Sequence, residues 1–190
     1  MSSSEQDQQI VSETREWLEK VVIGLQLCPF AGAVHEKNLI RYAVSHATTE
    51  QQLLADLHNE LHALEQAHPE HIDTTLLIHP WVLADFLDFN DFLDAADQAL
   101  DDIELIGTMQ IASFHPRFQF DGCALDAIEN FSNRSPYPML HLLREDSVSR
   151  AVDTHPDIDS IPERNVETLR ALGHDGWVRL GFDGAKKRVE

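Results

Sequence analysis

The chain has 190 residues, of which 43% are hydrophobic and 25% charged, the size and composition of one soluble globular domain. It carries 14 basic and 33 acidic residues, a formal net charge of -19. Nucleic acids and anionic membranes bind through basic surfaces, so we expect neither as a partner. No signal peptide or membrane span is recognisable, and two cysteines, Cys28 and Cys123, suit a reducing compartment, so we expect a cytoplasmic protein.

Helical and strand-like patterns alternate through the first two-thirds of the chain. Residues 1–9 are polar and lack periodicity, so we expect residues 1–11 to be disordered. Apolar residues at helical spacing predict helices over 12–27, over 49–67 and over a segment that ends near Leu100. Runs of β-branched and apolar residues predict strands over 39–47, 74–79 and 105–115.

The last third is less regular, because Pro136 and Pro138 force the residues before them out of helical space. Its expected elements are a short helix over 125–131, a strand over 139–144, a short helix over 147–152 and a helix from Pro162 to Gly173. We expect residues 184–190 to form a loose tail.

Helices that alternate with strands predict parallel crossover connections. The expected fold is therefore a single α/β domain over residues 12–183, built around one mostly parallel or mixed sheet. A two-layer α+β fold of the ferredoxin-like kind is the alternative. In such sheets, sites gather outside the carboxyl ends of the strands.

Two predicted strands end in the same dipeptide, His79-Pro80 and His115-Pro116. If the strands are parallel, both imidazoles emerge at one edge of the sheet. His115 is then the leading candidate for a general acid or base, because imidazole titrates near neutral pH. The competing interpretation is that each histidine only caps its strand.

Arginine is unusually concentrated after residue 116 for so acidic a chain. Arginine binds carboxylate or phosphate with two parallel hydrogen bonds, which makes a convergent cluster a candidate anion site. The candidate substrate-binding residues are Arg117, Asn133, Arg134 and Arg144. Tyr137 and His141 are further candidates for proton transfer. Alternatively, the arginines pair with neighbouring acidic residues.

Cys28 is a possible nucleophile, although a thiol at the C-terminal end of a helix should have a raised pKa, which favours a buried structural role. His79, His115 and His141 offer three imidazoles for a zinc-type site, without a metal-binding motif to support it. No phosphate-binding loop, dinucleotide fingerprint or serine-hydrolase motif occurs, so we expect no cofactor.

Three blocks of sequence, GLQLCPFA, FHPRFQF and NRSPYPMLHLLRE, resemble an uncharacterised bacterial protein family of roughly this length, a domain of unknown function. The resemblance spans about residues 13–176. It implies a bacterial, cytoplasmic protein with a single domain. It implies no activity and brings no catalytic residue.

Three functional hypotheses follow from these residues. The first is a small enzyme that holds an anionic metabolite with arginines and transfers a proton through histidine. The second is a metal-binding protein that uses the three histidines. The third is a non-catalytic adaptor whose acidic surface docks a basic partner, with Asp85, Asp88, Asp91, Asp94 and Asp97 spaced along one helix.

Overall fold

Four strands form one mixed sheet in the computed structural model, which describes residues 2–154 and 157–182. They are β1 (Ile40–Val44), β2 (Thr74–Ile78), β3 (Met109–Phe114) and β4 (Met139–Arg144), in the order β1-β2-β4-β3. β1 runs parallel to β2, and β4 runs antiparallel to both β2 and β3. The carboxyl ends of β1, β2 and β3 therefore share one edge, and the predicted single α/β domain with a mixed sheet is confirmed.

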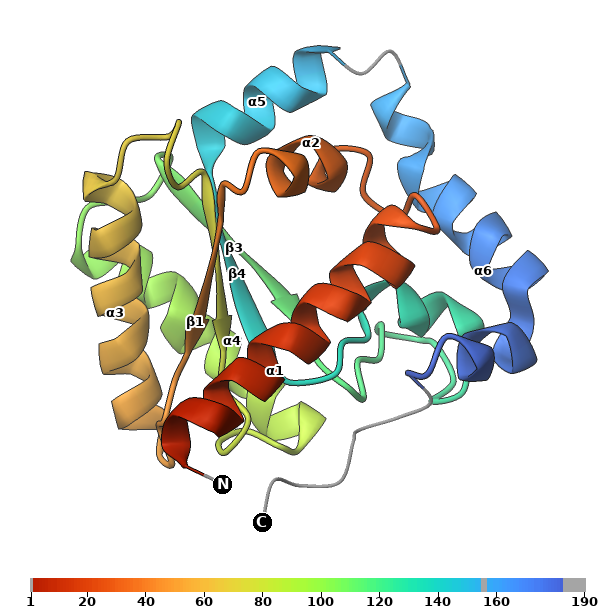
Figure 1. The fold of residues 1–190 in the computed structure, drawn as a ribbon, viewed down its shortest axis with the longest axis horizontal. Coiled ribbons are helices and arrows are strands. Elements are labelled where there is room, and N and C mark those ends of the chain that lie inside the picture. The colour runs from red at the N-terminus through yellow and green to blue at the C-terminus, as the bar shows by residue number, and fades with distance from the viewer. Residues whose placement is uncertain (1, 155–156, 183–190) are drawn as a thin grey trace.

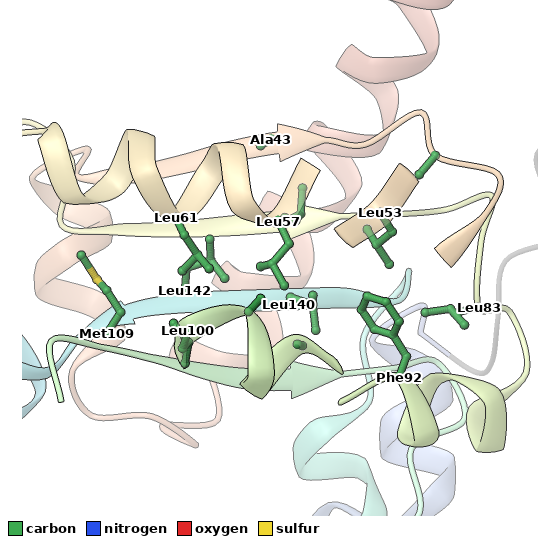
Figure 2. Packing of buried hydrophobic residues seen from close by; sticks show 14 of the residues in the cluster. Ala43, Leu53, Leu57, Leu61, Leu83, Phe92, Leu100, Met109, Leu140 and Leu142 are labelled. Atoms are coloured by element: carbon green, nitrogen blue, oxygen red, sulfur yellow. The ribbon is translucent and has the colours of Figure 1, made fainter. Parts of the chain in front are cut away.

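Two helices cover one face of the sheet, α3 (Glu50–Gln66) and α4 (Phe86–Asp102). Each begins at a side chain that caps its first turn: Thr49 accepts from the amide of Gln52, and Asp85 accepts from the amide of Leu87. Of the five leucines that form the expected stripe of α3, Leu53, Leu57, Leu61 and Leu64 are fully buried against this face and Leu54 is partly buried. Figure 2 labels the first three of the buried ones. This core explains why both helices form where helical periodicity predicts them.

The other face is covered by α1 (Ser3–Trp17), the π-helix η1 (Leu18–Ile23) and α6 (Ile161–Arg179). Trp17 and Trp177 are buried there. The shorter elements are α2 (Ala31–Glu36), η2 (Ile128–Asn133), α5 (Glu145–Thr154) and η3 (Ile158–Ser160). Figure 1 shows α1 crossing this face, with α2 and α5 above it and α6 to one side. No helix in the described part of the chain is long and apolar enough to span a membrane.

The first helix begins earlier than the sequence predicts. Disorder is expected over residues 1–11, but Ser2 accepts from the amide of Glu5 and the Glu5 carboxylate accepts from the amide of Ser2, which forms a capping box. Ile10 is also buried, so this segment is anchored as well as capped. The apolar residues before position 17 are too sparse to show a stripe.

Other boundaries move for local reasons. β3 starts at Met109 instead of residue 105, because Gly107 has a φ of 77° in the turn that precedes it. The expected helix over 125–131 is a 3-10 helix at residues 128–133, and α2 was not predicted. Gly173, with a φ of 65°, interrupts α6 at the predicted stop, after which helical residues continue. The expected tail, 184–190, lies outside the described residues.

Candidate functional site

His79 and His115 lie at the same edge of the sheet, as predicted. Their neighbours Ile78 and Phe114 are both paired with Met139 of the central strand β4. Both imidazoles are buried, and both rings stack on Phe89 of α4, with centroids 5.6 and 5.1 Å away. The two histidines therefore sit inside the protein under α4.

Both rings hold the loop between β2 and α4. His79 Nδ1 lies 3.2 Å from the carbonyl oxygen of Val82, and His115 Nε2 lies 3.2 Å from that of Leu83. His115 Nδ1 accepts from the amide of Arg117, which fixes its other nitrogen as the donor. Burial lowers the pKa of each ring to about 4. At neutral pH both are uncharged supports of this loop, which favours the capping interpretation for His115.

The three candidate arginines contact three different segments. Arg117 donates to the carbonyl oxygen of Ala84 at 2.8 Å and to Asp85 at 3.2 Å. Arg134 donates to the carbonyl oxygens of Phe118 and Leu125, and its guanidinium lies 4.1 Å from the ring centre of Phe131. Arg134 therefore holds the loop after β3.

Arg144 points to the α3 side of the sheet. Its guanidinium donates to the carbonyl oxygens of Leu64, Ala67 and Ile72, which closes the C-terminal end of α3. The guanidinium groups of Arg117, Arg134 and Arg144 have no hydrogen-bond partner in common within residues 2–154 and 157–182, so they do not converge on a single anion site there.

Tyr137 and Asn133 also have internal partners. The Tyr137 hydroxyl donates to Glu13 of α1 at 2.6 Å, and burial beside that carboxylate raises the pKa of the phenol. The Asn133 side chain donates to the carbonyl oxygen of Ser113, and its backbone carbonyl accepts from the amide of His115. The two side chains therefore connect the segment before β4 to α1 and to β3.

His141 lies on the opposite face of the sheet from His79 and His115. It is paired in register with Leu76 and Ala112, on the side covered by α1 and η1. The three imidazoles of the zinc hypothesis are thus divided between two faces. Among the described residues, no group of three or more His, Cys, Asp or Glu side chains is placed to hold a metal ion.

A cavity of about 320 Å³ lies on this face of the sheet, and His141 is in its floor. The other floor residues occupy alternate positions of all four strands: Ile40, Thr74, Leu76, Gln110, Ala112, Phe114 and Leu143. The roof comes from η1, α2, α5 and the loop between η1 and α2: Leu18, Val22, Cys28, Phe30, Ala31, Val34, Val148 and Ala151. The cavity is therefore mostly lined by hydrocarbon.

The hydrogen bonds of Thr74 fix the protonation of His141. The Thr74 hydroxyl has one proton, which it donates to the carbonyl oxygen of Leu142 at 2.6 Å. His141 Nε2 lies 2.7 Å from the same hydroxyl oxygen and is therefore the donor in that contact. Burial lowers the pKa of His141 to about 4, so the ring is neutral. Nδ1 is left as an acceptor with a free lone pair.

The other polar side chains around the cavity differ in whether they have hydrogen-bonding capacity left for a ligand. Ser147 donates to Asp73 at 2.6 Å, so these two side chains pair with each other. Gln110 has no side-chain hydrogen bond to any residue that the structure describes. His141 Nδ1 and the Gln110 amide thus offer free hydrogen-bonding capacity to a ligand, and Arg144, which also borders the cavity, has a buried Nε with no partner among the described residues.

The turn that ends η1 places Cys28 in the roof of the cavity. The π-helix η1 is followed by a turn in which Gln26 has a φ of 56°, and the carbonyl oxygen of Val22 accepts from the amides of both Leu27 and Cys28. Short π-helical segments that follow an α-helix directly, as η1 does, are often found at functional sites. Asn165 of α6 donates to the carbonyl oxygen of Leu27 and fixes this turn from the other side. Cys28 and His141 therefore line one cavity, although 113 positions separate them in the sequence.

Two further surfaces bear on the sequence hypotheses. At the carboxyl end of β1, an open cavity of about 420 Å³ is lined by His46, Asp56 and Glu60. The Asp56 carboxylate accepts a hydrogen bond from Ser45, and the Glu60 carboxylate accepts one from Arg41. On α4, the side chains of Asp88, Asp91, Asp94 and Asp97 are exposed, as expected for a solvated helix face. Neither surface presents an unpaired buried group.

Sequence reasoning named His141 and Cys28 but missed Thr74, Gln110 and Ala112. The available signal is the alternation along the strands: Gln110, Ala112 and Phe114 occupy every second position of β3, so they share a face. Which of the two faces is left partly uncovered depends on how α1, α2 and α5 pack, and the strand pattern holds no information on that.

Comparison with known proteins gives one result. No curated protein and no solved structure matches the chain. A family model described as a protein of unknown function, DUF1415, matches residues 9–179. This agrees with the resemblance of the GLQLCPFA, FHPRFQF and NRSPYPMLHLLRE blocks to a domain of unknown function. The chain therefore belongs to the DUF1415 family.

Proposed function

We propose that the protein binds a small, uncharged and mostly apolar molecule in the cavity on the sheet, with one donor group of the ligand facing His141. The observation that carries the proposal is a cavity of about 320 Å³ with hydrocarbon walls and a neutral imidazole in its floor. Ligand sites typically combine an apolar cavity of this size with a few placed polar groups.

The charge state around the cavity supports a neutral ligand. His141 carries no positive charge at neutral pH, because burial disfavours its protonated form. Arg144 borders the cavity but directs its guanidinium to the carbonyls at the end of α3. An alcohol or amide proton can meet His141 Nδ1, whereas Arg144, the cation that borders the cavity, is already engaged with protein carbonyls through one terminal nitrogen. The anionic metabolite of the first hypothesis would have to reach the Nε of Arg144, which is buried and has no partner among the described residues, so we rank it below a neutral ligand.

Blocking the cavity tests this proposal. We expect the neutral fluorescent probe N-phenyl-1-naphthylamine to bind the wild-type protein, and Ala112→Phe, which puts a ring into the cavity floor, to abolish binding. Ala55→Phe is the matched control, because Ala55 is exposed on α3. Ala151→Phe blocks the cavity from the roof and replaces Ala112→Phe if that variant does not fold. Equal probe binding by the blocked variants and the control would refute the proposal.

A catalytic role is the second candidate, favoured by the placement of a thiol and an imidazole in one cavity. In this role Cys28 would be the nucleophile and His141 would accept its proton. The test is the pH dependence of alkylation at Cys28, with Cys123 as the internal control. A catalytic pair predicts fast alkylation of Cys28 that becomes slow in His141→Gln. Alkylation of Cys28 that is no faster than that of Cys123, and unchanged in His141→Gln, would exclude this role.

A further inference from the structure

A second cavity, of about 460 Å³, lies next to the first. The two cavities share three wall residues, Val22, Cys28 and Phe114. The second cavity extends from this shared wall to the segment before β4 and the start of α6, whose side chains Ile161, Val166 and Leu169 line it. Cys28 thus lines both cavities.

The polar side chains around the second cavity already have partners in the protein. Asn165 donates to the carbonyl oxygen of Leu27, and Asn133 donates to that of Ser113. Ser132 donates to the carbonyl oxygen of Glu129, whose own carboxylate accepts from Arg170. A ligand in this space therefore meets mostly hydrocarbon, together with polar side chains that are each bonded to the protein.

The two cavities together form a longer space whose free hydrogen-bonding groups lie at one end. Free hydrogen-bonding capacity lies in the first cavity, at His141 Nδ1 and Gln110. Beyond Cys28 most of the lining is hydrocarbon, and the polar side chains there already have a partner in the protein. A compact ligand would use the first cavity alone, whereas a linear one could bury its apolar part in both.

We infer that the ligand is an elongated aliphatic molecule whose polar head lies at His141 and whose chain passes Cys28 into the second cavity beneath α6. This inference rests on the proposed function, because it uses the same head-group position. It names the substrate class as a single-chain amphiphile with an uncharged, hydrogen-donating head. A rigid, compact ligand confined to the first cavity is the competing outcome.

A homologous series of primary alcohols tests the inference. Each alcohol displaces N-phenyl-1-naphthylamine from the wild-type protein, and the affinities are compared from pentanol to decanol. Each added methylene that is buried should strengthen binding about fourfold, the equivalent of ~0.8 kcal/mol. We expect this gain to continue through decanol, since the second cavity receives the end of the chain. A plateau reached within the shorter alcohols would overturn the inference.

Filling the second cavity separates its contribution from that of the first. In Val166→Trp, a large ring on α6 occupies the second cavity, so decanol should bind no better than the shorter alcohols while pentanol binds as in the wild type. Val178→Trp on the same helix is the matched control, because Val178 is 52% exposed. Ile161→Trp serves if Val166→Trp does not fold. Unchanged decanol affinity in the filled variants would overturn the inference.

The outcomes distinguish this inference from the function on which it rests. If pentanol binds and Ala112→Phe abolishes its binding, but longer chains gain nothing, the proposed function stands and the elongated ligand is excluded. If no alcohol binds the wild-type protein, both fail. As an independent readout, decanol should slow the alkylation of Cys28 by N-ethylmaleimide and leave that of Cys123 unchanged. Equal rates at Cys28 with and without bound decanol would contradict a chain that passes this residue.

Discussion

Acidification should destabilise the protein through its buried histidines. Burial lowers the pKa of His79, His115 and His141 to about 4, whereas an unfolded imidazole titrates near 6.5. Above pH 6.5 the rings are neutral in both states and the stabilisation is fully present. As the pH falls from 6.5 towards 4, the unfolded state takes up protons first, so the free energy of unfolding decreases.

The size of this effect follows from the two pKa values. At pH 5 the unfolded form of each imidazole is almost fully protonated and the folded form almost fully neutral, which costs about 2 kcal/mol per histidine. Around this pH, each histidine should contribute a slope of about 1.2 kcal/mol per pH unit. Three such groups are enough to remove much of the ~5–15 kcal/mol of a typical domain.

Urea unfolding at pH 7, 6 and 5 measures this slope. In His115→Gln we expect a slope that is smaller than that of the wild type by about 1.2 kcal/mol per pH unit, whatever the stability at pH 7. His62→Gln is the control, since it removes an exposed imidazole on α3 in place of a buried one. Identical slopes in the wild type and His115→Gln, or an NMR pKa near 6.5 for His115 in the folded protein, would refute the reasoning.

Three further substitutions test individual contacts by urea unfolding. Gly24→Ala should lower stability by about 1–3 kcal/mol, because a Cβ there would lie too close to the carbonyl oxygen of Lys20; an unchanged midpoint would argue against the π-turn. Arg144→Leu should cost about 3 kcal/mol by freeing the carbonyls at the end of α3, and a neutral result would mean that water replaces the guanidinium. Tyr137→Phe should cost about 1 kcal/mol and leave probe binding intact, whereas a loss of binding would place Tyr137 in the site.

The sequence predicts the elements whose apolar pattern is regular, whether they are buried on one side, as α3 is, or on both, as β2 is. α3 follows a leucine stripe and a capping threonine, and β2 is a short apolar run, so both lie close to their predicted bounds. The N-terminal helix is missed because its anchoring depends on a few residues, including Ile10, that become buried only when α1 packs on the sheet. The shared edge of His79 and His115 could be predicted because chain direction alone determines it.

The partners of the arginines could not be predicted in the same way. Local sequence suggests pairing with nearby acids, whereas the acid that Arg117 contacts, Asp85, is 32 positions away in the sequence. Arg134 and Arg144 instead donate to backbone carbonyls of segments up to 80 positions away. Every residue has a carbonyl, so no residue type marks such a partner. The cavity escapes prediction for a related reason, since its roof and floor come from segments that meet only in the packed fold.

The central claim is that His141 Nδ1 receives the polar head of a ligand, and imidazole NMR on nitrogen-labelled protein tests it most directly. On saturation with decanol, the Nδ1 resonance of His141 should move from the position of a free pyridine-type nitrogen towards that of a hydrogen-bonded one. The rings of His79 and His115 on the opposite face should show no change. An unmoved His141 resonance in the presence of bound decanol, or a change confined to His79 and His115, would contradict the account.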